Sequence, residues 1–124
     1  MLLSEEEDKL VEVLAQIYCN IPWGKMRTNK YPQDIFNHRV RAASRRGSIY
    51  EFVSSLCNYF SLQTIPNSLQ KVIDDLRENQ DRILNELSKS HIPYCVRAYI
   101  RGKEIREERK RKNKEKRDEE KKKL

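Results

Sequence analysis

The apolar residues of this chain recur three and four positions apart within several segments of its first 100 residues. Residues with that spacing lie on one face of an α-helix, because a helix turns by about 100° per residue. The chain also has only three glycines and four prolines, too few for a turn-rich β fold. The sequence therefore predicts an all-α protein, a compact bundle of about five helices with a charged C-terminal helical extension.

Breaks in the apolar pattern separate the expected helices. Pro22, Pro66 and Pro93 each follow an isoleucine at an expected boundary, where a helix start does not need the missing N–H. We expect helices over residues 4–20, 32–46, 48–60, 67–90 and from 94 onward. Residues 1–100 would form a helical bundle domain, and residues 101–124 a highly charged C-terminal helix or tail.

Capping signals support two of these helix starts. Ser4 with Glu7, and Ser48 with Glu51, are serine and glutamate pairs three positions apart, the spacing of a capping box. Gly47 follows the second helix and is expected to be its left-handed C-cap. The third helix would then follow the second almost without a linker.

The third helix has the most apolar face of the five. That face consists of Ile49, Phe52, Val53, Leu56 and Phe60. Side chains of this size contribute most to stability when they are fully buried. We therefore expect the third helix to form the centre of the core.

Residues 101–124 are almost entirely charged, with thirteen Lys or Arg and seven Asp or Glu. Glu107 with Arg111 and Glu108 with Lys112 are four positions apart, in the orientation that stabilises an isolated helix by about 0.2 to 0.5 kcal/mol per pair. The segment is therefore either a solvated helix or a charged tail without fixed structure.

A second concentration of positive charge lies between Lys25 and Arg46, where seven Lys or Arg accompany a single acid, Asp34. The flanking segments are net negative, so the positive charge is a local feature. On a helix that begins at Pro32, the apolar residues and the cations fall on opposite sides. The candidate nucleic-acid-binding residues are Lys25, Arg27, Lys30, His38, Arg39, Arg41, Arg45 and Arg46.

A cationic face of this kind favours a polyanionic partner, because each cation on a phosphate releases condensed counterions. Trp23 and Tyr31 flank the cations and are candidates for stacking on unpaired bases, although a loop tryptophan also fits a lid on the core. Asn37, Arg41 and Arg45 carry donors that base edges accept, but no helix-turn-helix spacing accompanies them. The pattern therefore favours sequence-independent contact with the nucleic-acid backbone. A solvated helix face and an acidic protein partner remain open.

The sequence contains few residues of the types that commonly act in catalysis, and they do not form a known catalytic motif. Neither His38 nor His91 lies at motif spacing from a carboxylate and a nucleophile, and no glycine-rich phosphate loop occurs. Cys19, Cys57 and Cys95 form no CxxC pair, so we expect reduced thiols in the core and no metal site. We expect a protein that is not an enzyme, has no cofactor, and is cytoplasmic, because no apolar run is long enough to span a membrane.

The size, the helical content and the basic stripe of Arg39, Arg41, Arg45 and Arg46 resemble the small subunits of class 1 CRISPR interference complexes. The resemblance covers residues 4–100 and concerns architecture, without a shared motif. Such subunits are helical bundles that line up along a filament and hold the guide duplex or the displaced DNA strand.

The resemblance implies a cytoplasmic ribonucleoprotein subunit. Its partners would be a guide RNA duplex or displaced single-stranded DNA, other subunits of the complex, and copies of itself. The four arginines would contact the strand, and Ile49, Phe52 and Phe60 would lie in the core.

Two other functions fit the same residues. The first is a stand-alone DNA-binding transcriptional regulator, dimeric, whose basic helix enters a major groove. The second is an assembly adaptor that docks on a larger protein or RNA particle through the charged helix after Ile100.

Overall fold

A computed structural model describes residues 2–23, 31–62 and 67–122 of the chain, with the side chains of 120–122 excepted. These residues form six α-helices and a short 3-10 helix, without a strand, which confirms the all-α prediction. The elements are α1 (Ser4–Asn20), α2 (Pro32–Ala43), α3 (Ile49–Tyr59), α4 (Asn67–Leu76), η2 (Arg77–Asn79), α5 (Gln80–Lys89) and α6 (His91–Lys122).

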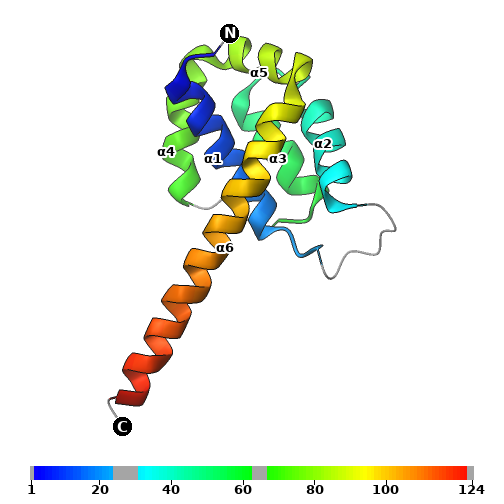
Figure 1. Ribbon diagram of the computed structural model, residues 1–124. Helices are drawn as coiled ribbons and strands as arrows, with labels where there is room; N and C mark the ends of the chain where they lie inside the picture. The colour runs from blue at the N-terminus through cyan, green and yellow to red at the C-terminus, as the bar shows by residue number, and fades with distance from the viewer. Residues whose placement is uncertain (1, 24–30, 63–66, 123–124) are drawn as a thin grey trace.

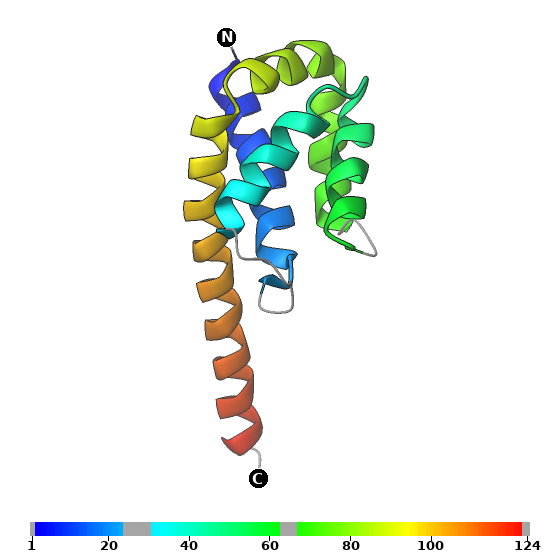
Figure 2. The ribbon, with the colours of Figure 1, turned by 90° about the vertical axis from the view of Figure 1, so that its right-hand side faces the viewer.

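Helix α1 lies in the middle of the bundle, between α6 on one side and α4 on the other (Figures 1 and 2). It contributes more buried apolar residues than α3 does: Leu10, Val11, Val13, Leu14, Ala15, Ile17 and Cys19. The prediction that α3 forms the centre of the core is therefore wrong. Helix α3 packs as one of the outer layers, with its single apolar face turned inward.

Helices α1 and α6 run side by side in the same direction. Arg97 on α6 donates to Asp8 on α1, and Arg109 donates to Asn20, so both contacts join residues 89 positions apart. Because the separation is constant, the two helices advance together over most of the length of α1. Ile105 of α6 is still buried in the core, so the packed part of this helix continues past residue 100.

Close approach of these two helices depends on Gly102. A Cβ atom at this position would lie 3.3 Å from the ring of Tyr18 and 3.6 Å from the carbonyl oxygen of Ala15. The Tyr18 ring is itself held by its contacts with Trp23, Phe36 and Tyr99. A larger side chain at position 102 would have to displace α6 from α1.

Of the two predicted capping boxes, the second is confirmed in its serine cap alone, because the Glu51 carboxylate accepts from Gly47 and not from Ser48, and the first is wrong. Ser48 Oγ accepts from the backbone N–H of Glu51 at 3.1 Å. At α1 the residue before the helix is Leu3, whose N–H donates to the Glu6 carboxylate at 3.0 Å. Glu6 rather than Glu7 reaches back because it is the third residue after the cap, Leu3. Glu6 is also buried, and Arg82 donates to it at 2.8 Å.

The single helix predicted over residues 67–90 is divided into α4, η2 and α5, and the chain turns between them (Figure 1). The turn falls at Arg77–Asn79, where no side chain is buried. Helix α5 starts at Gln80, whose side-chain oxygen accepts from the backbone N–H of Ile49 at 3.2 Å. This bond ties the start of α5 to the start of α3.

The three cysteines are buried and unpaired, which confirms the prediction of reduced core thiols. Burial raises the pKa of Cys95 to about 12 and raises the pKa of Cys19 and Cys57 as well. Thiolates are the reactive form of cysteine, so these three thiols are poorly suited to nucleophilic chemistry in the folded protein.

Replacing Phe52 with alanine should lower the free energy of unfolding by about 3 to 5 kcal/mol, because the side chain is fully buried and its removal leaves a cavity. Urea unfolding followed by circular dichroism measures the change. Tyr50→Ala is the matched control, since Tyr50 lies on the same helix and is 57% exposed. Equal losses in the two variants would contradict the packing of α3.

Replacing Gly102 tests the contact between α1 and α6. Gly102→Ala should stay within about 1 kcal/mol of the parent chain, because the gain in helix propensity offsets the tight contact with Tyr18. Gly102→Leu should cost about 1 to 3 kcal/mol from overpacking. The same unfolding measurement applies, and a leucine variant as stable as the parent would show that the helices are not in close contact.

Candidate nucleic-acid interface

Helix α2 presents its two sides as the sequence predicts. Phe36, Val40 and Ala43 are buried against the bundle. His38 and Arg41, three positions apart, are both exposed. Burial of the apolar face fixes the rotation of the helix about its axis. The basic side chains on the opposite face therefore point to solvent.

The end of α2 differs from the prediction. The helix ends at Ala43, not at Arg46, and Gly47 has no positive φ angle and is not a left-handed cap. Ser44, which is buried, donates through its hydroxyl to the carbonyl oxygen of Arg41 at 2.6 Å. The Glu51 carboxylate accepts from the N–H of Gly47 at 3.2 Å. Arg45 and Arg46 therefore lie in the turn between α2 and α3.

Arg39 is partly withdrawn from solvent. Its guanidinium carbon lies 3.6 Å from the centroid of the Tyr59 ring, a cation–π contact that joins α2 to the end of α3. An arginine stacked in this way keeps its outer N–H groups available, because the ring occupies one face of the planar group. Arg39 is thus held in one orientation at the edge of the basic surface.

Arg41, Arg45 and Arg46 are exposed and form no ion pair with a carboxylate of the described residues. A titratable neighbour of Arg41 is another basic group, His91 at the start of α6. Burial, and then the charge of Arg41, lower the pKa of His91. The three arginines therefore carry uncompensated positive charge at one end of the bundle.

The two aromatic candidates for base stacking, Trp23 and Tyr31, have different environments in the structure. Trp23 packs against Tyr18 and Phe60, and its indole N–H donates to the carbonyl oxygen of Tyr18 at 3.2 Å. It is a lid on the core, so its role as a stacking residue is not supported. Tyr31 is 79% exposed immediately before α2, where its ring is accessible. Lys25, Arg27 and Lys30 lie outside the described residues.

Asn37 was a candidate for reading base edges, but its side chain is engaged within the protein. The Tyr99 hydroxyl, on α6, donates to the carbonyl oxygen of Gln33 at 2.9 Å and also contacts the side-chain oxygen of Asn37. These contacts link α2 to α6. Asn37 therefore helps to position α2, and its side-chain oxygen is not free for the two-point contact by which asparagine reads adenine.

The sequence prediction missed a polar hollow beside Arg46. It is lined by Glu51, Ser54, Ser55 and Asn58 of α3 together with Arg46. The four α3 residues are three, four and seven positions apart, on the face opposite the apolar one. This polar spacing in the sequence could have predicted that they lie together. Hydroxyl and amide donors next to an arginine are groups that commonly contact phosphate and sugar oxygens.

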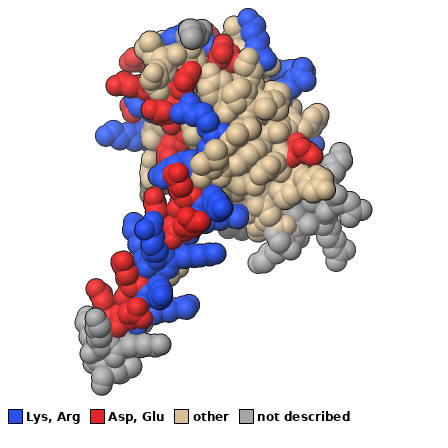
Figure 3. Space-filling view, in the orientation of Figure 1, with Lys and Arg blue, Asp and Glu red and all other residues tan. Residues whose placement is uncertain are grey.

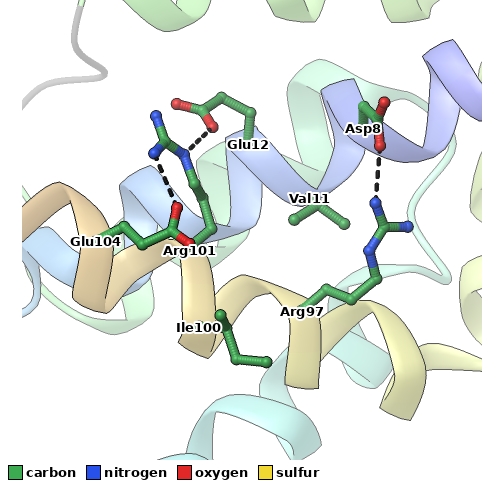
Figure 4. Close-up of a pocket in the computed structure, with 7 residues that line it drawn as sticks. All are labelled: Asp8, Val11, Glu12, Arg97, Ile100, Arg101 and Glu104. Carbon is green, nitrogen blue, oxygen red and sulfur yellow. Dashed lines mark hydrogen bonds and ion pairs between the residues drawn. The ribbon is translucent and has the colours of Figure 1, made fainter.

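A second surface pocket lies between α1 and α6, and its charged residues pair with one another (Figure 4). Arg97 bonds Asp8 at 2.7 Å, and Arg101 bonds both Glu12 at 2.9 Å and Glu104 at 3.2 Å. Burial opposes ionisation of Glu12, but its bonds with Arg101 and Gln16 outweigh that effect and lower its pKa. This network holds the two helices together and leaves little charge for a ligand.

The described residues contain no group of three or more His, Cys, Asp or Glu placed to hold a metal ion. Among them, no helix has the length and apolar character needed to cross a membrane. The chain matches no protein-family model, no curated protein and no solved structure. The surface around α2 therefore has to be interpreted from its own geometry.

Tyr99→Phe tests whether Asn37 has a structural role. Loss of the hydroxyl should lower the free energy of unfolding by about 0.5 to 1.5 kcal/mol, because its bonds to Gln33 and Asn37 disappear. Thermal or urea unfolding measures the loss. Tyr31→Phe is the control, since that ring is exposed, and an effect there as large as at Tyr99 would argue against the link between α2 and α6.

Proposed function

We propose that this protein is a non-catalytic nucleic-acid-binding protein that holds an RNA or DNA backbone on the basic surface of α2 and the turn after it. The observation that carries the proposal is the exposure of Arg41, Arg45 and Arg46 without a carboxylate partner among the described residues. Arginines that pair with carboxylates lie elsewhere in the described residues, as Arg97 and Arg101 of α6 and Arg82 of α5 do.

The geometry favours phosphate contact over base reading. Arginine offers a fork of donors that matches phosphate oxygens. The residue that would have discriminated a base, Asn37, is bound to Tyr99. With the Asn37 oxygen engaged, two-point contact with adenine is lost, and the exposed arginines match phosphate oxygens, so the proposed contact is to the backbone and does not depend on sequence. This argues against the stand-alone transcriptional regulator, which needs specific base contacts.

We propose further that the biological setting is a cytoplasmic ribonucleoprotein complex, as a small subunit of a CRISPR effector. The helical bundle and its accessible arginines support this setting, since they are the features on which the resemblance rests. The nucleic acid would be the guide duplex or the displaced single strand. Reconstitution with a purified effector complex tests this setting separately from binding itself.

Replacing Arg41 and Arg45 with alanine should weaken binding to single-stranded and duplex probes alike. Each lost phosphate contact lowers the slope of log affinity against log salt concentration by about one, so the pair should lower it by about one to two units. Fluorescence anisotropy with labelled RNA and DNA at two salt concentrations measures both quantities. Stability should change by less than about 0.5 kcal/mol, because both side chains are exposed.

The matched control replaces Lys71 and Arg77, two exposed cations near α4 on the other side of the bundle, with alanine. Net charge falls by the same amount in both double variants. If the control weakens binding as much as the α2 variant does, attraction is a property of the total charge and the basic surface of α2 has no special role. Unchanged affinity in the α2 variant would favour an acidic protein as the partner.

A further inference from the structure

The last part of α6 is a helix that stands clear of the bundle (Figures 1 and 2). The last contact between α6 and α1 is at Asn20, whose side-chain oxygen accepts from Arg109 at 3.0 Å. From Lys110 to Glu119 every described side chain is exposed. Since a helix rises 1.5 Å per residue, this part extends about 15 Å beyond the bundle.

The start of this projection is strongly cationic. Residues 110–117 hold six cations and one acid, Glu115, and the cations are Lys110, Arg111, Lys112, Lys114, Lys116 and Arg117. None of the six forms an ion pair with the carboxylates of the described residues. The pair expected between Glu108 and Lys112 is absent because Glu108 turns back to Arg101, at 3.4 Å. We refer to residues 110–117 as the α6 cationic segment.

The cations of this segment lie on all sides of the helix. At about 100° per residue, Lys110 and Lys114 lie on one side, and Lys112 and Lys116 lie on the opposite side. Figure 3 shows Lys and Arg side chains leaving the projecting helix in different directions. The basic residues of α2, in contrast, occupy one side of a helix whose other side is buried.

A helix with positive charge on opposite sides fits a ligand that has negative charge on two sides. A flat acidic protein surface would contact one side only and leave the lysines of the other side in water. The major groove of B-form DNA is about 12 Å wide, admits an α-helix and has a phosphate strand along each edge. The major groove of A-form RNA is too narrow and deep for this.

We propose that the α6 cationic segment inserts into the major groove of duplex DNA and contacts phosphates of both strands. The inference rests on the proposed function only for the class of ligand, because the residues involved are different. A helix with its side chains is about 10 to 12 Å across, close to the width of the groove. Glu107 and Glu108 precede the segment, and Asp118 and Glu119 follow it. Phosphates repel these acids, so contact is limited to the eight residues between them, and with the helix lying along the groove each of its two cationic sides faces one phosphate strand.

The test uses two double variants of the full chain, Lys110→Gln with Lys114→Gln and Lys112→Gln with Lys116→Gln. Each removes two charges from one side of the helix, and glutamine forms helices about as well as lysine. The control is Lys71→Gln with Arg77→Gln near α4. Fluorescence anisotropy is measured with a mixed-sequence DNA duplex and with an RNA duplex of the same sequence. Circular dichroism verifies that helix content is kept.

Each double variant is expected to lower the salt slope for duplex DNA by about two units, and the four substitutions together by about four. The RNA duplex is expected to show smaller losses, and the control variant none. A loss confined to one side of the helix would overturn the proposal, because the segment would then contact one strand only. Equal losses for RNA and DNA, or no loss in either variant, would also overturn it.

The variant of Arg41 and Arg45, measured in parallel, separates this inference from the proposed function. If it weakens binding while both α6 variants bind DNA normally, the proposed function stands and the groove insertion fails. If the α6 variants weaken binding to duplex DNA while the α2 variant does not, the groove insertion stands and the role of α2 fails.

Discussion

The parallel pairing of α1 with α6 determines how the rest of the protein is arranged. The acids at the start of α1 meet the arginines of α6 at a constant separation along the chain, as in the bonds of Arg97 to Asp8 and Arg101 to Glu12. Gly102 lets the two backbones approach where a side chain would collide with Tyr18. Exposed ion pairs are individually weak, but an aligned set of them selects one register of the two helices over its neighbours. That register decides how much of α6 is packed and how much projects.

The direction of the basic surface depends on the same helices. Tyr18 of α1, Phe36 of α2 and Tyr99 of α6 pack against one another, with ring centroids between 4.8 and 6.0 Å apart. This aromatic cluster fixes the rotation of α2, and the contact of Tyr99 with Asn37 reinforces it. Arg41 faces solvent as a result. Orientation of the candidate nucleic-acid interface is therefore a property of the core and not of the arginines themselves.

Features decided by neighbouring residues could be predicted from the sequence, and features decided by distant contacts could not. Helix class, the Ser48 cap and the outward face of α2 follow from spacing within one turn of helix. The turn at Arg77–Asn79 could not be predicted because Leu76 and Ile83 are seven positions apart, as on one face of an unbroken helix. The bond from Ile49 to Gln80 between them is a contact that the spacing does not indicate. Arg39 stacks on Tyr59, and Asn37 contacts Tyr99, which is 62 positions away. The spacing of residues within one helix cannot predict contacts between residues so far apart in the sequence.

The uneven charge of the sequence acquires a physical explanation from this arrangement. The acidic N-terminal segment neutralises the first arginines of α6, since Glu7 and Asp8 pair with Arg97, and Glu12 pairs with Arg101. Helix α1 ends at Asn20, so it provides no acids for the cations that come later on α6. Within residues 2–23, 31–62 and 67–119, groups of neighbouring cations without a carboxylate partner therefore remain in the turn after α2 and in the α6 cationic segment. The net charge that attracts a polyanion is concentrated where the helices end. The two places differ in shape, because the basic residues of α2 and its turn lie on one side of a helix, whereas those of the α6 cationic segment lie all around one.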